Sequence, residues 1–146
     1  MDKKKIIIIN GPNLNLLGKR EPEIYGASGF EEYFLELQKH NSDLLIEYYQ
    51  SNIEGKLVNK IQETEGKFDG IILNAAAYTH TSVAIHDAIG AISVPVLEIH
   101  ISNIYKREEF RHKSIISSKC VGMISGLGLK GYQLALDYFK TIKRKK

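Results

Sequence analysis

The chain has 146 residues, 43% of them hydrophobic, which suits a single globular domain over residues 1–146. Its formal net charge of +3 comes from the chain ends, because residues 3–5 and a basic tail of about 140–146 hold eight of the twenty basic residues. Between Ile6 and Phe139, 12 basic and 16 acidic residues give a net charge of −4, which argues against a nucleic-acid partner.

The first predicted element is a buried parallel strand at the four-isoleucine run, residues 6–9. An uninterrupted β-branched run that stops at Gly11 and Pro12 is typical of such a strand. The loop that follows, from Gly11 to Ser28, is unusually long for a connection between a strand and a helix. Ligands of open α/β sheets bind beyond the carboxyl ends of strands, so this loop is a candidate part of a site.

Two helices and a strand follow this loop. We predict a helix from Phe30 with Ser28 as its cap, a strand at 44–49, and a second helix that opens at a capping-box sequence, residues 51–54. Gly66 ends the second helix. The apolar positions with helical spacing are Phe30, Phe34, Leu35, Leu37, Leu57, Val58 and Ile61.

The second half of the chain repeats this alternation. Strands are predicted at 69–74, 95–100 and 121–125, and a helix between the first two contains Val83, Ile85, Ala88 and Ile89. Three glycines lead into a last helix. Its predicted inward face consists of Leu134, Leu136, Tyr138, Phe139 and Ile142.

Five strands that alternate with helices indicate an α/β fold: a flavodoxin-like, doubly wound five-stranded parallel sheet in a three-layer α/β/α arrangement. The one cysteine, Cys120, excludes an intrachain disulfide and favours a reducing compartment. No stretch approaches the roughly 18 apolar residues of a membrane span, and no signal peptide is evident. We therefore expect a cytoplasmic protein with no membrane partner.

Polar side chains follow the first, third and fourth predicted strands at matching positions. Since parallel strands bring their carboxyl ends to one edge, we expect these groups to converge on a site. The three groups are Asn10, Asn13, Arg20 and Tyr25; Asn74, Tyr78, Thr79, His80, Thr81 and Ser82; and Glu98, His100, Ser102 and Asn103.

Each group also has a purely structural interpretation. The residues 10–12 could form only a tight turn, and Thr79, Thr81 and Ser82 could be helix caps. A metal site is poorly supported, because His80 and His86 are six residues apart and no second cysteine exists. No phosphate-binding loop is present, and Gly126, Gly128 and Gly131 lack dinucleotide-fingerprint spacing and suit close helix-to-sheet packing. We expect no cofactor.

Several motifs, in order over nearly the whole chain, closely resemble type II 3-dehydroquinate dehydratase. They are Gly11-Pro-Asn-Leu-Asn-Leu-Leu-Gly18, Arg20-Glu-Pro22, Tyr25-Gly26, Ala77-Tyr-Thr-His-Thr-Ser82, Glu98-Ile-His-Ile-Ser-Asn103 and Arg107-Glu-Glu-Phe-Arg111. The resemblance implies a lyase that removes water from 3-dehydroquinate by syn elimination through an enolate, giving 3-dehydroshikimate. That step belongs to the shikimate pathway to chorismate and aromatic amino acids. The implied mechanism uses neither metal nor Schiff base.

The resemblance also implies roles for single residues. Tyr25 matches the base that abstracts the C2 proton, Arg20 the arginine that favours its phenolate, and Asn13 the asparagine that holds a water against the enolate oxygen. His100 matches the acid that protonates the leaving hydroxyl, and Glu98 would orient or charge its imidazole. The substrate-binding positions would be Asn74, His80, Asp87, Ile101, Ser102 and Arg111.

The family assembles as a dodecamer of four trimers, which we carry over as an expectation. The chain departs from the family pattern at three places. Ala75-Ala76 replaces a usual Pro-Gly, Ile53 stands where histidine is common, and Tyr105-Lys106 replaces a frequent His-Ala pair. These departures bear on subunit packing and loop mobility more than on chemistry.

Other interpretations stay open at this point. A flavodoxin-like domain could bind a small anion without converting it, and a nucleic-acid adaptor could use the basic tail. Within the enzyme hypothesis, Lys19 beside Arg20 could form a Schiff base, although a loop lysine is usually solvated. A role in quinate breakdown is an alternative to biosynthesis.

Overall fold

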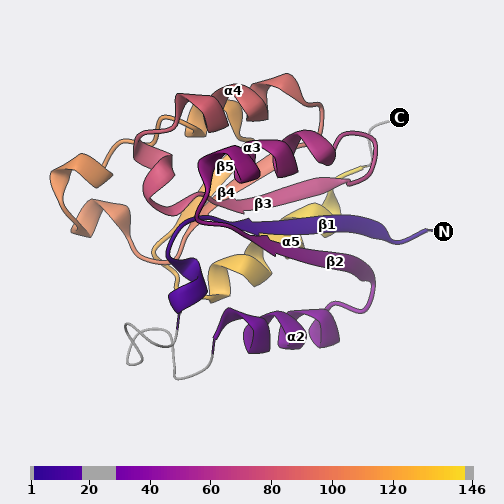
Figure 1. Ribbon diagram of the computed structural model, residues 1–146. Helices are drawn as coiled ribbons and strands as arrows, with labels where there is room; N and C mark the ends of the chain where they lie inside the picture. Colours follow the sequence, from indigo (N-terminus) through magenta and orange to yellow (C-terminus); the bar gives the residue numbers. More distant parts are fainter. Residues whose placement is uncertain (1, 18–28, 144–146) are drawn as a thin grey trace.

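The computed structural model describes residues 2–17 and 29–143. Five parallel strands form one sheet in the order β2-β1-β3-β4-β5 (Figure 1). This is the order of a flavodoxin-like doubly wound sheet, so the predicted fold class is confirmed. The strands are β1 (Lys4–Asn10), β2 (Leu44–Gln50), β3 (Gly70–Asn74), β4 (Val96–His100) and β5 (Gly122–Ser125).

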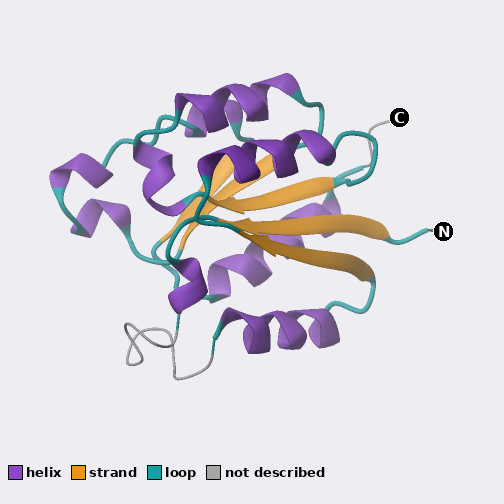
Figure 2. Ribbon diagram, in the orientation of Figure 1, coloured by secondary structure: helices purple, strands orange, loops and turns teal. Residues whose placement is uncertain are grey.

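Helices cover both faces of the sheet, which gives the predicted three layers. Figure 2 shows α3 and α4 above the strands, α2 below them and α5 behind them, and residues of α2 and α5 pack into one core on the same face of the sheet. The described helices are α2 (Phe30–His40), α3 (Glu54–Glu63), α4 (Val83–Ala91) and α5 (Lys130–Thr141). Short 3-10 turns lie in the loops: η1 (Leu14–Leu16), η2 (Ala76–His80), η3 (Ile104–Lys106), η4 (Glu109–Arg111) and η5 (Ser117–Lys119).

The isoleucine run of β1 is apolar throughout because both faces of this central strand are buried. Ile6 and Ile8 pack into the core beneath α2 and α5, and Ile7 and Ile9 pack into the core beneath α3 and α4. All four side chains are at most 1% exposed. Burying each one stabilises the fold by about 1.5–3 kcal/mol.

The inward face of α5 differs from the prediction. Its buried side chains include Tyr132, Ala135, Leu136 and Phe139, whereas Tyr138 is 38% exposed. Positions 132, 135, 136 and 139 repeat at three- and four-residue spacing, so residue 138 falls outside the stripe. The prediction of Tyr138 as an inward residue was wrong.

Two predicted helix caps also need correction. Gly29 occupies the cap position of α2, and Ser28 lies outside the described residues. Ser51 does not form a capping box, because its Oγ accepts from the backbone N–H of Ile53 at 3.0 Å and α3 begins only at Glu54. The cap at Ser82 is confirmed, since its Oγ accepts from the N–H of Ile85 at 2.9 Å.

Candidate active site

A cavity of about 270 Å³ lies at the carboxyl edge of the sheet. Its walls come from the loop after β1, from η2 after β3, and from the segment after β4. Residues from each of the three polar groups of the sequence therefore meet at one place, as expected where parallel strands end at one edge. The cavity is lined by Pro12, Asn13, Leu14, Leu16, Leu17, Asn74, Ala76, Ala77, His80, His100, Ile101, Ser102, Ile104, Arg107 and Arg111.

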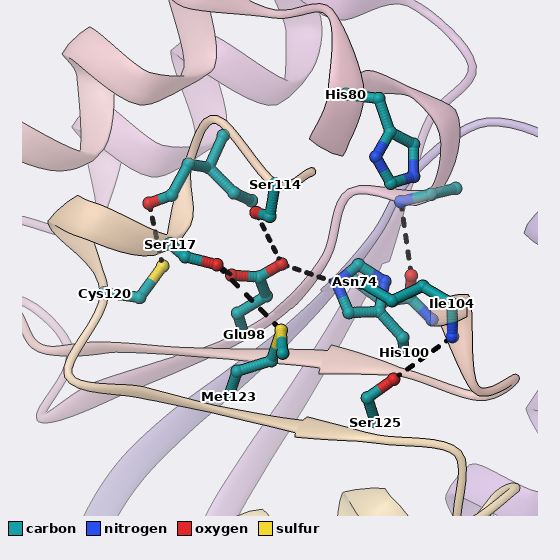
Figure 3. Close-up of polar contacts among 12 residues, drawn as sticks. Asn74, His80, Glu98, His100, Ile104, Ser114, Ser117, Cys120, Met123 and Ser125 are labelled. Atoms are coloured by element: carbon teal, nitrogen blue, oxygen red, sulfur yellow. Dashed lines mark hydrogen bonds and ion pairs between the residues drawn. The ribbon is translucent and has the colours of Figure 1, made fainter. Parts of the chain in front are cut away.

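The most buried charged group of the site is the carboxylate of Glu98, which is fully buried on β4. His100, at the end of the same strand, contacts it through Nε2 at 2.5 Å. Figure 3 shows the carboxylate between the His100 ring and two serines, Ser114 and Ser117, whose hydroxyls both donate to it. The Ser114 bond is 2.8 Å long.

These contacts determine the pKa of the Glu98 carboxyl and therefore its charge. Burial by itself would raise the pKa of the Glu98 carboxyl. The hydrogen bonds from His100 and Ser117, the charge of His100 and the hydrogen bond from Ser114 outweigh burial and hold this pKa below its usual range. Glu98 is therefore an anion at neutral pH. Since a carboxylate only accepts, Nε2 of His100 carries a hydrogen, and Nδ1 makes no hydrogen bond among the described residues.

A second imidazole lies beside the first. The rings of His80 and His100 stack with their centroids 6.4 Å apart and their planes 23° apart. Nδ1 of His80 lies 2.8 Å from the carbonyl oxygen of Lys113, so this nitrogen carries a hydrogen. Both histidines line the cavity, and each has one nitrogen engaged by the protein.

Asn74 is held by a separate, neutral network. Its Nδ2 donates to the Tyr132 hydroxyl at 3.2 Å, and that hydroxyl donates to Oδ1 of Asn10 at 2.7 Å. Burial raises the pKa of Tyr132 far above its ordinary value of 10, so the hydroxyl stays neutral. The network joins the ends of β1 and β3 to α5.

The turn after Asn74 has an unusual backbone. Ala76 has φ of 52°, in the left-handed region that favours glycine, and its N–H donates to Oδ1 of Asn74 at 3.2 Å. Gly11 packs against this turn so closely that a Cβ at position 11 would lie 2.6 Å from the Ala75 oxygen. The backbones of Gly11 and Ala75 therefore lie in close contact next to Pro12 and Ala76, which line the cavity.

Two arginines, Arg107 and Arg111, line the cavity. Arg111 Nε lies 3.0 Å and Arg107 Nε 3.8 Å from one oxygen of the exposed Glu108. Arg107 also donates to the Ser102 hydroxyl at 3.4 Å. Two guanidiniums share one carboxylate, so a positive charge is left to attract an anionic ligand. Among the described residues, no group of three or more metal-ligating side chains is present, and no helix is long and apolar enough to cross a membrane.

The family model for dehydroquinase class II matches residues 4–140. The chain belongs to the class II dehydroquinase family. It is 52% identical over 135 residues to a 3-dehydroquinate dehydratase of Clostridium botulinum, covering 91% of this chain and 92% of that one. It is 55% identical over 134 residues to the 3-dehydroquinate dehydratase of Campylobacter jejuni, covering 90% and 84% of the two chains.

Solved structures agree with this membership. The type II dehydroquinase of Butyrivibrio crossotus matches with a TM-score of 0.90 and 45% identity, covering 95% of this chain and 99% of that one. The type II dehydroquinase of Propionibacterium acnes matches with a TM-score of 0.90 and 40% identity over 96% and 98% of the chains. The resemblance seen in the sequence is therefore confirmed.

In this class II dehydroquinase, most of the predicted site residues surround the cavity. Glu98 lies behind His100, and Asp87 lies on α4 with its side chain 71% exposed and is not part of the cavity wall. Arg20 and Tyr25 lie outside the described residues. The predicted residues on the cavity wall are Asn13, Asn74, His80, His100, Ile101, Ser102 and Arg111.

Sequence reasoning missed several residues of the site. Arg107 opens the same motif as Arg111, so the motif itself could have pointed to it. Ser114, Ser117 and Tyr132 carried no such signal, because each contacts the site from a distant position in the chain.

Of the departures from the dehydroquinase pattern, some lie on the exposed surface and one lies on the cavity wall. Ile53 is 55% exposed and Tyr105 61% exposed, and neither lines the cavity. Ala76 does line the cavity and stands where the family pattern has glycine, at a positive φ. This departure therefore bears on the site, not only on packing elsewhere.

Proposed function

We propose that this chain converts 3-dehydroquinate to 3-dehydroshikimate by syn elimination of water through an enolate intermediate. The observation that supports this most is His100, an imidazole on the wall of the cavity whose Nε2 is held by the buried Glu98 carboxylate. Such a pair is suited to general acid catalysis, and relatives with more than half of their residues identical are 3-dehydroquinate dehydratases.

The base in this proposal is Tyr25. A tyrosine hydroxyl ordinarily has a pKa of about 10, so a phenolate near neutral pH needs roughly 3 to 4 kcal/mol of preferential stabilisation. The guanidinium of Arg20, five residues away in the same loop, supplies a charge interaction of that order in a site that excludes water. The phenolate takes the C2 proton, and the electron pair left on carbon forms the enolate.

The acid is His100. Its imidazolium donates a proton to the departing hydroxyl, which leaves as water while the enolate collapses to the enone. The Glu98 carboxylate balances the imidazolium charge before this transfer and fixes the ring orientation. Asn13, whose backbone N–H donates to Oδ1 of Asn52 at 2.9 Å, holds a water against the enolate oxygen.

Substrate binding uses the rest of the cavity wall. The carboxylate of the substrate is anionic, so we assign it to Arg111 and the backbone amides of Ile101 and Ser102, and its hydroxyl groups to Asn74 and His80. Asp87 lies outside the cavity of its own chain. It can contact substrate only from a neighbouring copy, which fits the dodecamer of four trimers that we propose as the assembly.

The proposal includes a reaction without metal or Schiff base, a cytoplasmic location and a role in aromatic amino-acid biosynthesis. The test is the appearance of enone ultraviolet absorbance when purified protein meets 3-dehydroquinate. We expect turnover that a chelator leaves unchanged and that borohydride with substrate does not trap on Lys19. His100→Ala should lower kcat by about 10²- to 10⁴-fold.

A binding domain that does not convert its ligand is distinguished by Tyr25→Phe. This change should abolish turnover and leave substrate affinity, measured by calorimetry, within a few-fold of the original. Binding of 3-dehydroquinate by the unchanged protein with no enone formed would refute the lyase proposal. Loss of activity with chelator would refute its metal-free part alone.

A further inference from the structure

One irregular segment, residues 113–117, supports both cavity imidazoles. The carbonyl oxygen of Lys113 accepts from Nδ1 of His80 at 2.8 Å. The hydroxyls of Ser114 and Ser117 donate to the two oxygens of Glu98, Ser114 to Oε2 and Ser117 to Oε1, and Glu98 in turn holds His100. His80 lies at the end of η2 and His100 at the end of β4, so this segment is a physical link between two separate elements. Figure 3 shows the part of the link that runs from Ser114 and Ser117 through Glu98 to His100.

We propose that Ser114 and Ser117 are positioning residues for the dehydration, which keep the Glu98 carboxylate in place and thereby hold His100 facing the reacting hydroxyl. The inference rests on the proposed function, because it takes His100 to be the acid. Neither serine lines the cavity, so neither contacts substrate directly.

The chemistry of a buried carboxylate gives the reason. Glu98 is fully buried, and its Oε2 accepts from both His100 and Ser114 while its Oε1 accepts from Ser117. A buried anion is costly unless hydrogen bonds satisfy its oxygens. Hydroxyl donors satisfy them without bringing a second charge, so the positive charge that balances Glu98 is left to the imidazole that does the chemistry.

The surroundings of Glu98 supply no competing cation among the described residues. Its sheet neighbours on β3 and β5 are Leu73 and Met123, which are apolar. Cys120 lies on the turn after η5, where burial and the charge of Glu98 raise the pKa of its thiol to about 12, so it is neutral. The two serine hydroxyls and His100 are therefore the groups that compensate the carboxylate.

The segment does not depend on the two serines for its place in the fold. Ile116, between them, is fully buried in the core beneath α3 and α4. The N–H of Ile115 donates to the carbonyl of Thr79 at 3.0 Å, and the N–H of Lys119 donates to the carbonyl of Ile116 at 3.0 Å. Removing a hydroxyl should leave this backbone in position.

The experiment compares Ser114→Ala, Ser117→Ala and the double variant with Ser118→Ala, a change at the adjacent exposed serine. We expect kcat to fall about tenfold in each single variant and further in the double, by up to about a hundredfold, with KM within about twofold. The acidic limb of the kcat–pH profile should move to higher pH, because a carboxyl that loses donors is easier to protonate. Ser118→Ala should match the unchanged protein, and Ser117→Thr should restore most of the rate.

Several results would overturn the inference. They are an unchanged rate and acidic limb in the double variant, an equal loss in Ser118→Ala, or a rise in KM alone. If the unchanged protein forms no enone, the proposed function fails separately. The link from the serines to Glu98 is then tested by carbon NMR titration of the Glu98 carboxyl, where an identical midpoint in the double variant overturns it. If the double variant does not fold, the rates and acidic limbs of the two single variants and of Ser117→Thr test the inference instead.

Discussion

Two polar networks lie under the same cavity and are built differently. The network of Asn10, Tyr132 and Asn74 is neutral, and all its members stand on β1, β3 and α5. The network around Glu98 is charged, and its donors Ser114 and Ser117 come from an irregular segment and a short 3-10 turn. Asn74 of the neutral network lines the cavity, and in our proposal His100 of the charged network donates the proton.

The difference has a physical origin. A neutral network needs only correct geometry, which regular elements packed around one core provide and which pH does not disturb. A buried anion in a charged network needs hydrogen-bond donors and a positive charge around it. Of the groups that donate to Glu98, only His100 lies on the same strand, β4. Loop serines therefore complete the network. We expect changes in the first network to affect stability and substrate binding, and changes in the second to affect rate and pH dependence.

The largest effect is expected for Glu98→Gln. The amide keeps the shape of the side chain and removes the charge that balances the His100 imidazolium, so kcat should fall by roughly 10²- to 10⁴-fold with little change in KM. Steady-state kinetics on enone formation measure this. A variant that keeps the original rate would show that the two networks do not differ as described.

The same variant should change the acid stability of the fold. The pKa of Glu98 is lower in the folded protein than in an unfolded chain, where it is about 4.3. Its contribution to stability is therefore complete above about pH 4.3 and is lost as pH falls through the lower folded value. In Glu98→Gln this contribution is absent, so the free energy of unfolding should fall less between neutral and acidic pH than in the unchanged protein. Urea unfolding at a series of pH values measures this difference.

A smaller effect is expected for Tyr132→Phe. The change leaves the Asn10 oxygen and the Asn74 amide without their common partner in a buried site, which costs about 1–3 kcal/mol of unfolding free energy. KM should rise and the pH profile of kcat should keep its shape. Tyr138→Phe, at an exposed position of the same helix, is the matched control. A shifted pH profile in Tyr132→Phe would contradict the division between the networks.

The smallest effect is expected for Ala76→Gly, beside Asn74. Glycine relieves the left-handed backbone, worth about 1–2 kcal/mol, but loses some of this gain to the greater freedom of the unfolded chain, so we expect a net gain of about 0.5–1 kcal/mol. Ala77→Gly, at a position without positive φ, should instead destabilise by about 0.5–1 kcal/mol. Thermal or urea unfolding measures the change in stability of both variants. An equal loss of unfolding free energy in the two would contradict the strain at Ala76.

The sequence by itself determined the parallel sheet and the edge at which a site forms. The isoleucine run predicted a strand buried on both faces, and the alternation of strands and helices predicted where their polar ends meet. These features depend on residues close together in the chain, whose periodicity and propensity can be read directly. The motifs at the strand ends were also local, which is why family membership could be predicted from them.

Only the tertiary structure decided which groups complete the site. Tyr132 is 122 positions from Asn10 and 58 from Asn74, and Ser117 is 19 from Glu98. The tertiary structure likewise decided that Tyr138 is exposed and that Asp87 is exposed and does not line the cavity. A hydrogen bond between distant segments leaves no local pattern, because it depends on how the packed elements place two side chains within about 3 Å of each other.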